Sequence, residues 1–324
     1  MQYRVDNGLA DVQSSLISAV IPSRQRPALL LAAVQSVLLQ GRNDLEVIVV
    51  LDGDTAGSAE ALGQAFPGHP QIRVLENATQ AGVSAARNRG VQAARGKWIA
   101  LLDDDDEWLP GKLEKQMTRA LASRFPEPVV TCQIRRDTGR PHPQHPPVRP
   151  MSEYLFVRKF FGEAGWVQTS TILAPRSLFL RVPFTEGLRK HEDMEWALRV
   201  SQEATVGFEF VAEPLATYDN QPGRERLTDF YDWQYSMAFA RSRRALMTRK
   251  GYAAFVLSRC NHAAARRGHW GAVIPIFAEA MRHGSPSITD VFVGLRFWLG
   301  RLGLGPVLRR IRMSTRRNSI SDTR

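Results

Sequence analysis

Apolar and polar positions alternate in two kinds of block along the first hundred residues. Short apolar runs, typical of buried strands, occur at Leu16–Pro22, Leu45–Leu51, Gln71–Leu75 and Trp98–Leu102. Segments with apolar residues at helical spacing lie between them, at Arg26–Gln40, Ser58–Phe66 and Val83–Arg95. This alternation predicts an α/β fold with a mainly parallel sheet flanked by helices.

The pattern changes in the second half of the chain. Pro141–Pro150 holds five prolines in ten residues and predicts a loop. A helix is predicted near Glu192–Ser201. Beyond Pro222 the spacing is helical at Leu227–Met247, Tyr252–Arg266, Trp270–His283 and Thr289–Leu302. We therefore expect a first domain of residues 1–221, followed by a helical region of residues 222–324.

The net charge of the chain indicates which class of partner it can bind. The chain has 43 Lys and Arg against 32 Asp and Glu, a net charge of +11, which favours anionic partners. From Arg296 to Arg324 there are eight arginines and one acid. Phe292, Leu295, Trp298 and Leu299 share a helical face there, which suits an interfacial helix on an anionic membrane surface or a core helix with a basic tail. Nucleic acid is not expected, because the basic residues are not interleaved with aromatics in a recognised module.

Localisation follows from what the pattern lacks. No run approaches the ~18 apolar residues of a membrane span, and Met1–Leu16 has no apolar core of a signal peptide. The two cysteines, Cys132 and Cys260, form no disulfide or zinc pattern. These features predict a cytoplasmic protein, with a peripheral contact to the inner face of the cell membrane as the alternative.

Candidate chemistry gathers where the predicted strands end. Pro22, Ser23 and Arg24 end the first, Asp52 ends the second, and Asp103-Asp104-Asp105-Asp106 follows the fourth. Ligands of parallel α/β sheets bind beyond the carboxyl ends of the strands, so we expect these segments to meet in one crevice.

The four adjacent aspartates repel one another unless a cation or a donor compensates them. Mg²⁺ and Mn²⁺ prefer such oxygen ligands and are usually bound by one or two carboxylates together with substrate phosphates. An acidic turn capping a helix near Pro110 explains the run equally well, with Asp106 as the capping residue. Asp52 alone is explained by an Asp-Gly turn, and Arg87 by pairing with a carboxylate or a phosphate.

Five motifs together resemble family 2 glycosyltransferases, which have the GT-A fold. They are VIPSRQRPALLLAAVQSVLLQ, EVIVVLDGD, AGVSAARNRG, KWIALLDDDDEWLPGKLEKQ and HEDMEWALR, in family order between Ser18 and Tyr218. The resemblance implies that Asp52 contacts the nucleotide base and that Pro22, Ser23 and Arg24 line the donor site. It implies Mn²⁺ or Mg²⁺ bound by Asp103 and Asp105, with Asp104 beside the ribose or phosphate and Arg87 near the donor. Leu51 departs from the family, which often has an acid there.

The resemblance also assigns a base. In the family a Glu-Asp pair supplies it, which implies that Asp193, beside Glu192, deprotonates the acceptor hydroxyl and that the anomeric centre inverts. The implied donor is a nucleotide-diphosphate sugar, UDP-linked by family frequency. The implied acceptor is a saccharide or lipid-linked saccharide in polysaccharide or glycolipid assembly. A non-catalytic binder of nucleotide sugars or anionic surfaces is the alternative. Gln168, Ser170 and Trp166 are candidates for the acceptor pocket, with core or surface structure as the equal alternative, and Arg224 is a candidate for a diphosphate contact.

Overall fold

The computed structural model describes residues 16–53, 56–136, 140–158, 163–218 and 230–303. The chain forms two compact units: Met1–Pro147 with Trp166–Arg224, and Val148–Gly165 with Glu225–Arg324. The first holds a sheet, and the second, the helical unit, includes a segment from the middle of the chain. The boundary expected after residue 221, and Arg224 beside it, lie outside the described residues.

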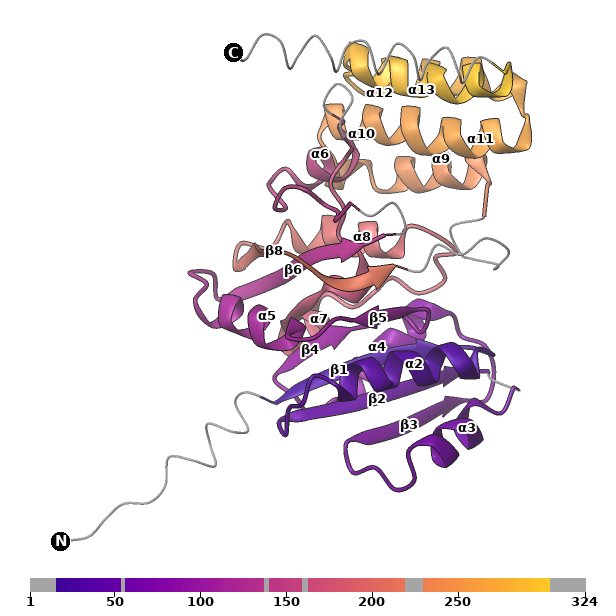
Figure 1. The fold of residues 1–324 in the computed structure, drawn as a ribbon. Coiled ribbons are helices and arrows are strands. Elements are labelled where there is room, and N and C mark those ends of the chain that lie inside the picture. Colours follow the sequence, from indigo (N-terminus) through magenta and orange to yellow (C-terminus); the bar gives the residue numbers. More distant parts are fainter. Residues whose placement is uncertain (1–15, 54–55, 137–139, 159–162, 219–229, 304–324) are drawn as a thin grey trace, which may run out of the picture. The chain divides into compact units, whose positions relative to one another are not determined.

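A single mixed sheet runs through the first unit (Figure 1). Its described strands have the order β3-β2-β1-β4-β7-β6-β8-β5. The four strands predicted from the apolar runs are adjacent and parallel: β1 (Ile17–Ser23), β2 (Leu45–Asp52), β3 (Ile72–Asn77) and β4 (Trp98–Leu101). β1, β2 and β4 are buried along their whole length, which explains their mainly apolar sequences.

The other half of the sheet mixes both orientations. It consists of β5 (Asp106–Trp108), β6 (Glu127–Arg135), β7 (Leu173–Pro175) and β8 (Val206–Tyr218). β8 carries acidic side chains that no short-range pattern assigns to a strand. Glu209 accepts a hydrogen bond from Ser123 and pairs with Arg119. These partners come from distant parts of the chain, so periodicity does not reveal the strand.

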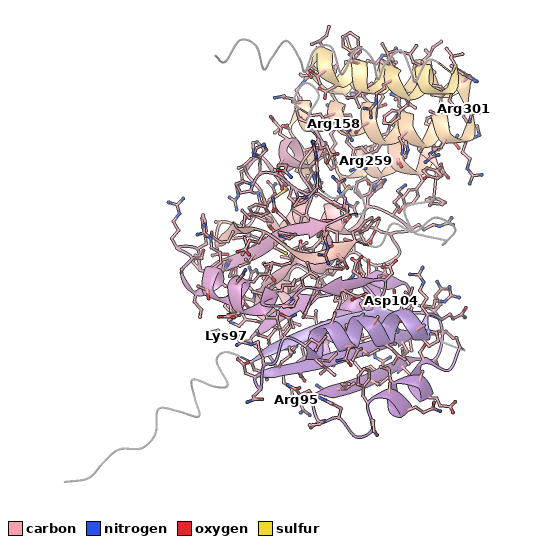
Figure 2. The ribbon with its side chains drawn as sticks, viewed as in Figure 1. Arg95, Lys97, Asp104, Arg158, Arg259 and Arg301 are labelled. Atoms are coloured by element: carbon pink, nitrogen blue, oxygen red, sulfur yellow. The ribbon has the colours of Figure 1, made fainter. Side chains whose placement is uncertain are left out.

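Helices pack against this sheet. They are α2 (Pro27–Leu38), α3 (Ser58–Ala65), α4 (Val83–Ala93), α5 (Lys112–Leu121), α7 (Arg176–Arg181) and α8 (Glu192–Val200). Val20 of β1 pairs with Leu101 of β4, and the next residue, Leu102, donates its N–H to the Val20 carbonyl at 3.1 Å. This register brings the residues after β4 level with the end of β1. In Figure 2, Lys97 and Asp104 mark opposite ends of the sheet along β4.

Gly90 lets α4 lie directly on β1 and β2. A Cβ at this position would sit 2.4 Å from Val20 Cγ1 and 3.2 Å from Val50 Cγ2. We expect Gly90→Ala to lower the free energy of unfolding by about 1–3 kcal/mol, because overpacking forces the helix off the sheet. Urea denaturation measures this difference.

Gly63 provides the matched control, since it lies exposed within α3 and an added Cβ would have nothing within 4 Å. Gly63→Ala should be neutral or stabilising by up to about 1 kcal/mol. Equal unfolding energies for the two variants would show that α4 does not need the close approach.

The helical unit stacks its helices in layers. Its described helices are α6 (Met151–Phe156), α9 (Trp233–Ser242), α10 (Arg249–Phe255), the π-helical η4 (Val256–Cys260), α11 (Asn261–Arg267), α12 (Val273–His283) and α13 (Ile288–Arg301). The continuous run α10–η4–α11 lies between α9 on one side and α12 with α13 on the other (Figure 1). No helix in the described part of the chain is both long enough and apolar enough to span a membrane.

Of the two alternatives for α13, the burial of Trp298 supports the core helix. Trp298 does not share an exposed face with Phe292 and Leu295, because its side chain is buried and its Nε1–H donates to Asn261 Oδ1 at 2.8 Å. An indole N–H within a core needs such a partner, and α11 provides it. Phe292 and Leu295 are exposed. The basic segment of residues 304–324 lies outside the described residues.

Candidate active site

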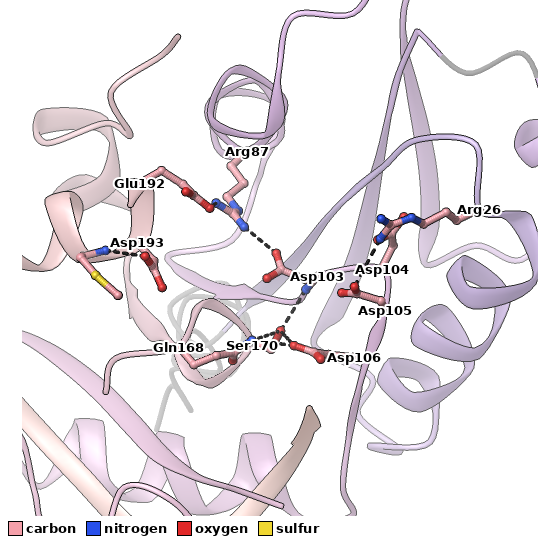
Figure 3. Close-up of polar contacts among 11 residues, drawn as sticks. Arg26, Arg87, Asp103, Asp104, Asp105, Asp106, Gln168, Ser170, Glu192 and Asp193 are labelled. Atoms are coloured by element: carbon pink, nitrogen blue, oxygen red, sulfur yellow. Dashed lines mark hydrogen bonds and ion pairs between the residues drawn. The ribbon is translucent and has the colours of Figure 1, made fainter. Parts of the chain in front are cut away.

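The acidic loop, Asp103–Asp106, follows β4 and reaches the end of β1 (Figure 3). Asp104 is buried, and its carboxylate accepts a hydrogen bond from Ser23 Oγ at 2.7 Å. Burial raises the pKa of Asp104 to about 6, although Ser23 and Arg26 oppose the shift. The predicted meeting of the first and fourth strand ends is therefore confirmed by a side-chain contact.

Arg26 is a site residue that the sequence analysis missed. Its Nη1 lies 3.3 Å from Asp104 Oδ1 and 3.3 Å from Asp105 Oδ2. Pro27 begins α2 directly after it, so the helix start positions Arg26 over the end of β1. A cation three residues past the end of β1, on the same edge of the sheet as the acidic loop, is the signal that could have identified it.

Asp106 does not cap a helix, contrary to the expectation. The nearest helix, α5, begins at Lys112 with Gly111 as its N-cap in the left-handed conformation. Asp106 is instead buried in β5, where Gln168 Nε2 and Ser170 Oγ each donate to its Oδ2 at 2.6 Å. Burial first, then the charges of Asp103 and Asp105, raise its pKa well above the ordinary value.

Gln168 and Ser170 hold the acidic loop by hydrogen bonds. Ser170 Oγ also accepts the backbone N–H of Asp103 at 3.0 Å, and both side chains are buried. Of the two alternatives for this segment, their burial supports core structure. Trp166 is partly buried and packs edge-on against Tyr218, with ring centroids 5.2 Å apart.

Arg87 connects the acidic loop to α8. Its guanidinium is buried, with Nη2 at 2.6 Å from Asp103 Oδ1 and Nη1 at 3.5 Å from Glu192 Oε1. Burial disfavours the charged form, but Asp103 and Glu192 outweigh it and raise the pKa of Arg87. In Figure 3, Arg87 lies between the two carboxylates. Of the two pairings expected from sequence, the structure shows the carboxylate.

The start of α8 presents the predicted base. His191 takes a left-handed conformation, φ 74°, which is uncommon for a residue other than glycine and turns the chain sharply into the helix. Glu192 and Asp193 follow in the first turn, both partly buried. Asp193 Oδ1 accepts the N–H of Met194 at 2.7 Å, and the charge of Asp193 acts on Arg87.

Asp52 ends β2 and is buried. Its carboxylate accepts hydrogen bonds from Asn77 Nδ2 and from the backbone N–H groups of Ala81 and Gly82, each at 2.8 Å. Asp52 therefore holds the chain that leads into α4. Of the other predicted donor residues, Pro22 is buried and Arg24 is exposed.

A cavity of about 350 Å³ adjoins the acidic loop. Its lining comes from α2, from the loop and from the ends of β6 and β8: Leu29, Ala32, Asp104, Asp105, Asp106, Glu107, Arg135, Arg136, Thr217 and Tyr218. Arg135, the last residue of β6, and Arg136, the next residue, were not predicted, because only the sheet topology brings that strand end to the acidic loop.

The carboxylates of the acidic loop can supply only part of the ligands of a divalent cation. Within the described ranges, no three or more His, Cys, Asp or Glu side chains are grouped for a metal. The side chains of Asp103 and Asp105 are 25% and 26% exposed. Two accessible carboxylates suit Mg²⁺ or Mn²⁺, which take their remaining ligands from substrate phosphates and water.

A family profile decides what kind of protein this is. The profile described as Glycosyl transferase family 2 matches residues 18–183, just over half of the chain. The chain belongs to glycosyl transferase family 2. The matched range contains the acidic loop, Arg87 and Asp52, and it ends before α8.

Relatives within this glycosyltransferase family are similar over different lengths. The amylovoran biosynthesis glycosyltransferase AmsB of Erwinia amylovora is 27% identical over 209 residues, covering 62% of this chain and 68% of AmsB. The putative teichuronic acid biosynthesis glycosyltransferase TuaG of Bacillus subtilis is 35% identical over 102 residues, covering 32% of this chain. That match spans 40% of TuaG, less than half of the relative.

Solved structures confirm the GT-A fold. S. aureus TarS 1-349 in complex with UDP-GlcNAc matches with a TM-score of 0.58 at 15% identity, covering 82% of this chain and 79% of that one. The mannosyltransferase PcManGT from Pyrobaculum calidifontis, in complex with GDP-Man and Mn²⁺, matches with a TM-score of 0.50 at 16% identity, covering 86% and 67%. The predicted fold class, with its helical C-terminal region, is therefore confirmed for this glycosyltransferase.

Proposed function

We propose that this glycosyltransferase moves a sugar from a UDP-linked donor to a hydroxyl of a saccharide or lipid-linked saccharide, with inversion, in polysaccharide or glycolipid assembly. One observation carries the proposal: Arg87 joins Asp103 of the donor-side loop to Glu192 beside the predicted base. Two segments far apart in sequence thus form one site. The similarity to AmsB, a glycosyltransferase of amylovoran biosynthesis, and to TuaG, a putative glycosyltransferase of teichuronic acid biosynthesis, supports the assembly role.

The donor would lie along the ends of β1, β2 and β4. Asp52 would contact the base, with Pro22, Ser23 and Arg24 around the nucleotide and Asp104 beside the ribose or phosphate. Asp103 and Asp105 would hold Mn²⁺ or Mg²⁺, which when bound neutralises charge on the departing diphosphate. PcManGT, which is similar in fold, has GDP-Man and Mn²⁺ in its structure, which supports this assignment.

Transfer itself requires a base opposite the departing diphosphate. A sugar hydroxyl attacks well only as its proton leaves, and Asp193 would take that proton. The acceptor oxygen then bonds to the anomeric carbon while the bond from that carbon to the diphosphate oxygen breaks. Attack from the opposite face inverts the anomeric centre. Glu192, held by Arg87, positions the turn that carries Asp193.

The experiment that tests the function is a panel of nucleotide sugars with Mn²⁺ or Mg²⁺, scored for nucleoside diphosphate release with and without saccharide acceptors. Release that depends on one donor, and increases with an acceptor, is the expected result. Donor binding without any release across the panel would favour the non-catalytic binder instead.

Asp105→Ala is expected to lower donor turnover at least about a hundredfold and to remove its dependence on Mn²⁺, because charge stabilisation by a metal is worth several kcal/mol. Chelation of the wild-type enzyme should have the same effect. Turnover is measured across a metal titration. Glu114→Ala, an exposed acid on α5, is the control and should keep wild-type behaviour. Full activity of Asp105→Ala in a chelator would overturn the metal assignment.

A further inference from the structure

The helical unit exposes an apolar face on its last two helices. Ile274 and Met281, one face of α12, are 81% and 63% exposed. On α13, Ile288, Phe292 and Leu295 follow at spacings of four and three residues and are 71%, 58% and 40% exposed. These five side chains define the apolar face. A single exposed apolar residue needs no explanation, but two aligned rows indicate a partner.

Both rows point away from the same underlying layer. α12 buries Ile276, Glu279 and Ala280, and α13 buries Gly294 and Trp298, and both helices pack on η4. The side of each helix opposite η4 is the side that carries the exposed apolar residues. Both rows therefore lie on the side of the unit away from η4.

The net charge of the helical unit indicates which kind of partner the apolar face binds. Between residues 230 and 303 there are eleven lysines and arginines but only three acids, an excess of 11 − 3 = 8. Each acid is engaged within the unit. Asp232 caps α9, Glu279 binds Arg241 and the Tyr252 hydroxyl, and Asp290 forms a capping box with Ser287. An apolar face on a cationic body is complementary to an anionic bilayer.

An arginine cleft lies between α11 and α13. This cavity of about 340 Å³ is lined by His262, Ala265, Arg266, Arg296, Phe297, Gly300 and Arg301, with no acid among them. Arg266 lies over the Tyr231 ring at 5.4 Å, a contact that orients the guanidinium while its N–H donors stay in its own plane. The guanidinium of Arg301 lies close to Gly268: a Cβ added at Gly268 would be 2.8 Å from Arg301 Nη2.

Phe292, Leu295 and Arg296 occupy adjoining strips of α13, so the cleft borders the apolar face. We infer that the helical unit docks on an anionic membrane, with the apolar face among the acyl chains and the arginine cleft binding a lipid phosphate. Guanidinium groups recognise phosphate oxygens with several parallel hydrogen bonds. This surface stands apart from the proposed transfer reaction, and a lipid-linked acceptor would be brought to the enzyme by it.

Vesicle binding of the full-length protein, measured without donor, tests the inference. Wild type should sediment with phosphatidylcholine vesicles that contain phosphatidylglycerol and not with phosphatidylcholine alone. The Arg266→Ala/Arg301→Ala variant should bind on the order of twentyfold more weakly, because each arginine near an anionic surface contributes roughly fivefold. Phe292→Ser should lose roughly tenfold or more, the cost of one buried aromatic side chain.

Control variants replace the same types of residue at positions outside the proposed membrane contact. Arg243→Ala removes a partly buried arginine just after α9, in the opposite layer, and Leu39→Ser removes an exposed apolar side chain after α2. Both should bind vesicles within about twofold of wild type, since single residues away from the contact contribute little.

Three outcomes would overturn the inference. Equal binding to both kinds of vesicle, or no loss in the arginine variant, would remove the lipid phosphate from the cleft. A concentration-dependent dimer that Phe292→Ser dissociates, with no vesicle binding by wild type, would assign the apolar face to a second copy of the chain. Because no donor is present, each result is independent of whether transfer occurs.

Discussion

The Asp193→Asn variant is expected to transfer sugar about 10²–10⁴-fold more slowly than wild type while binding the donor with unchanged affinity. Asparagine has nearly the shape of aspartate and can still accept the N–H of Met194, so the start of α8 should keep its conformation. It cannot take a proton from a hydroxyl at neutral pH. Transfer rates with saturating donor, together with calorimetric titration of the donor, separate chemistry from binding.

The control for this variant is Glu203→Gln, just beyond the end of α8, where Glu203 pairs with Arg181 on the surface. It removes one negative charge near the same helix and should leave transfer unchanged. If Asp193→Asn transfers sugar at the wild-type rate, another group is the base. If donor affinity falls with the rate, Asp193 holds the donor instead.

The second large effect is expected at Arg87. Arg87→Met should lower the free energy of unfolding by roughly 3–5 kcal/mol, because removing one partner of a buried ion pair leaves the other charge uncompensated. The lower end of this range is favoured, since Asp103 is a quarter exposed and water partly solvates it. Transfer should fall as well, because Asp103 and Glu192 lose the group that holds them. Urea unfolding and turnover measure the two effects.

A double-mutant cycle tests whether Arg87 acts through Glu192. Glu192→Gln removes one of the two carboxylates, so its addition to Arg87→Met should cost less than its addition to wild type. Arg95→Met is the control, because Arg95 is exposed just beyond α4 and its loss should change stability by less than about 0.5 kcal/mol. Additive losses in the cycle would mean that the contact between Arg87 and Glu192, 3.5 Å apart, carries no coupling.

The parallel half of the sheet could be predicted because its signal is local. β1, β2 and β4 are buried on both faces, so each appears in sequence as a mainly apolar run, in which Ser18 and Glu46 bind each other. β6 and β8 depend on pairing with distant segments, and the polar residues of β8 are compensated by side chains from elsewhere, such as Arg119. The acidic loop could likewise be located from its place after β4. The burial and the hydrogen-bond partners of each carboxylate could not be predicted.

The sequence by itself determined which chemical groups stand at the strand ends, because a parallel strand order places every carboxyl end on one edge. Only the tertiary structure decided how the four aspartates divide their roles. Asp104 and Asp106 are buried against Ser23 and Ser170, whereas Asp103 and Asp105 remain accessible beside Arg87 and Arg26. Burial and hydrogen bonding are properties of neighbours in space, and identical residues in a row acquire different chemistry only when the fold supplies different neighbours.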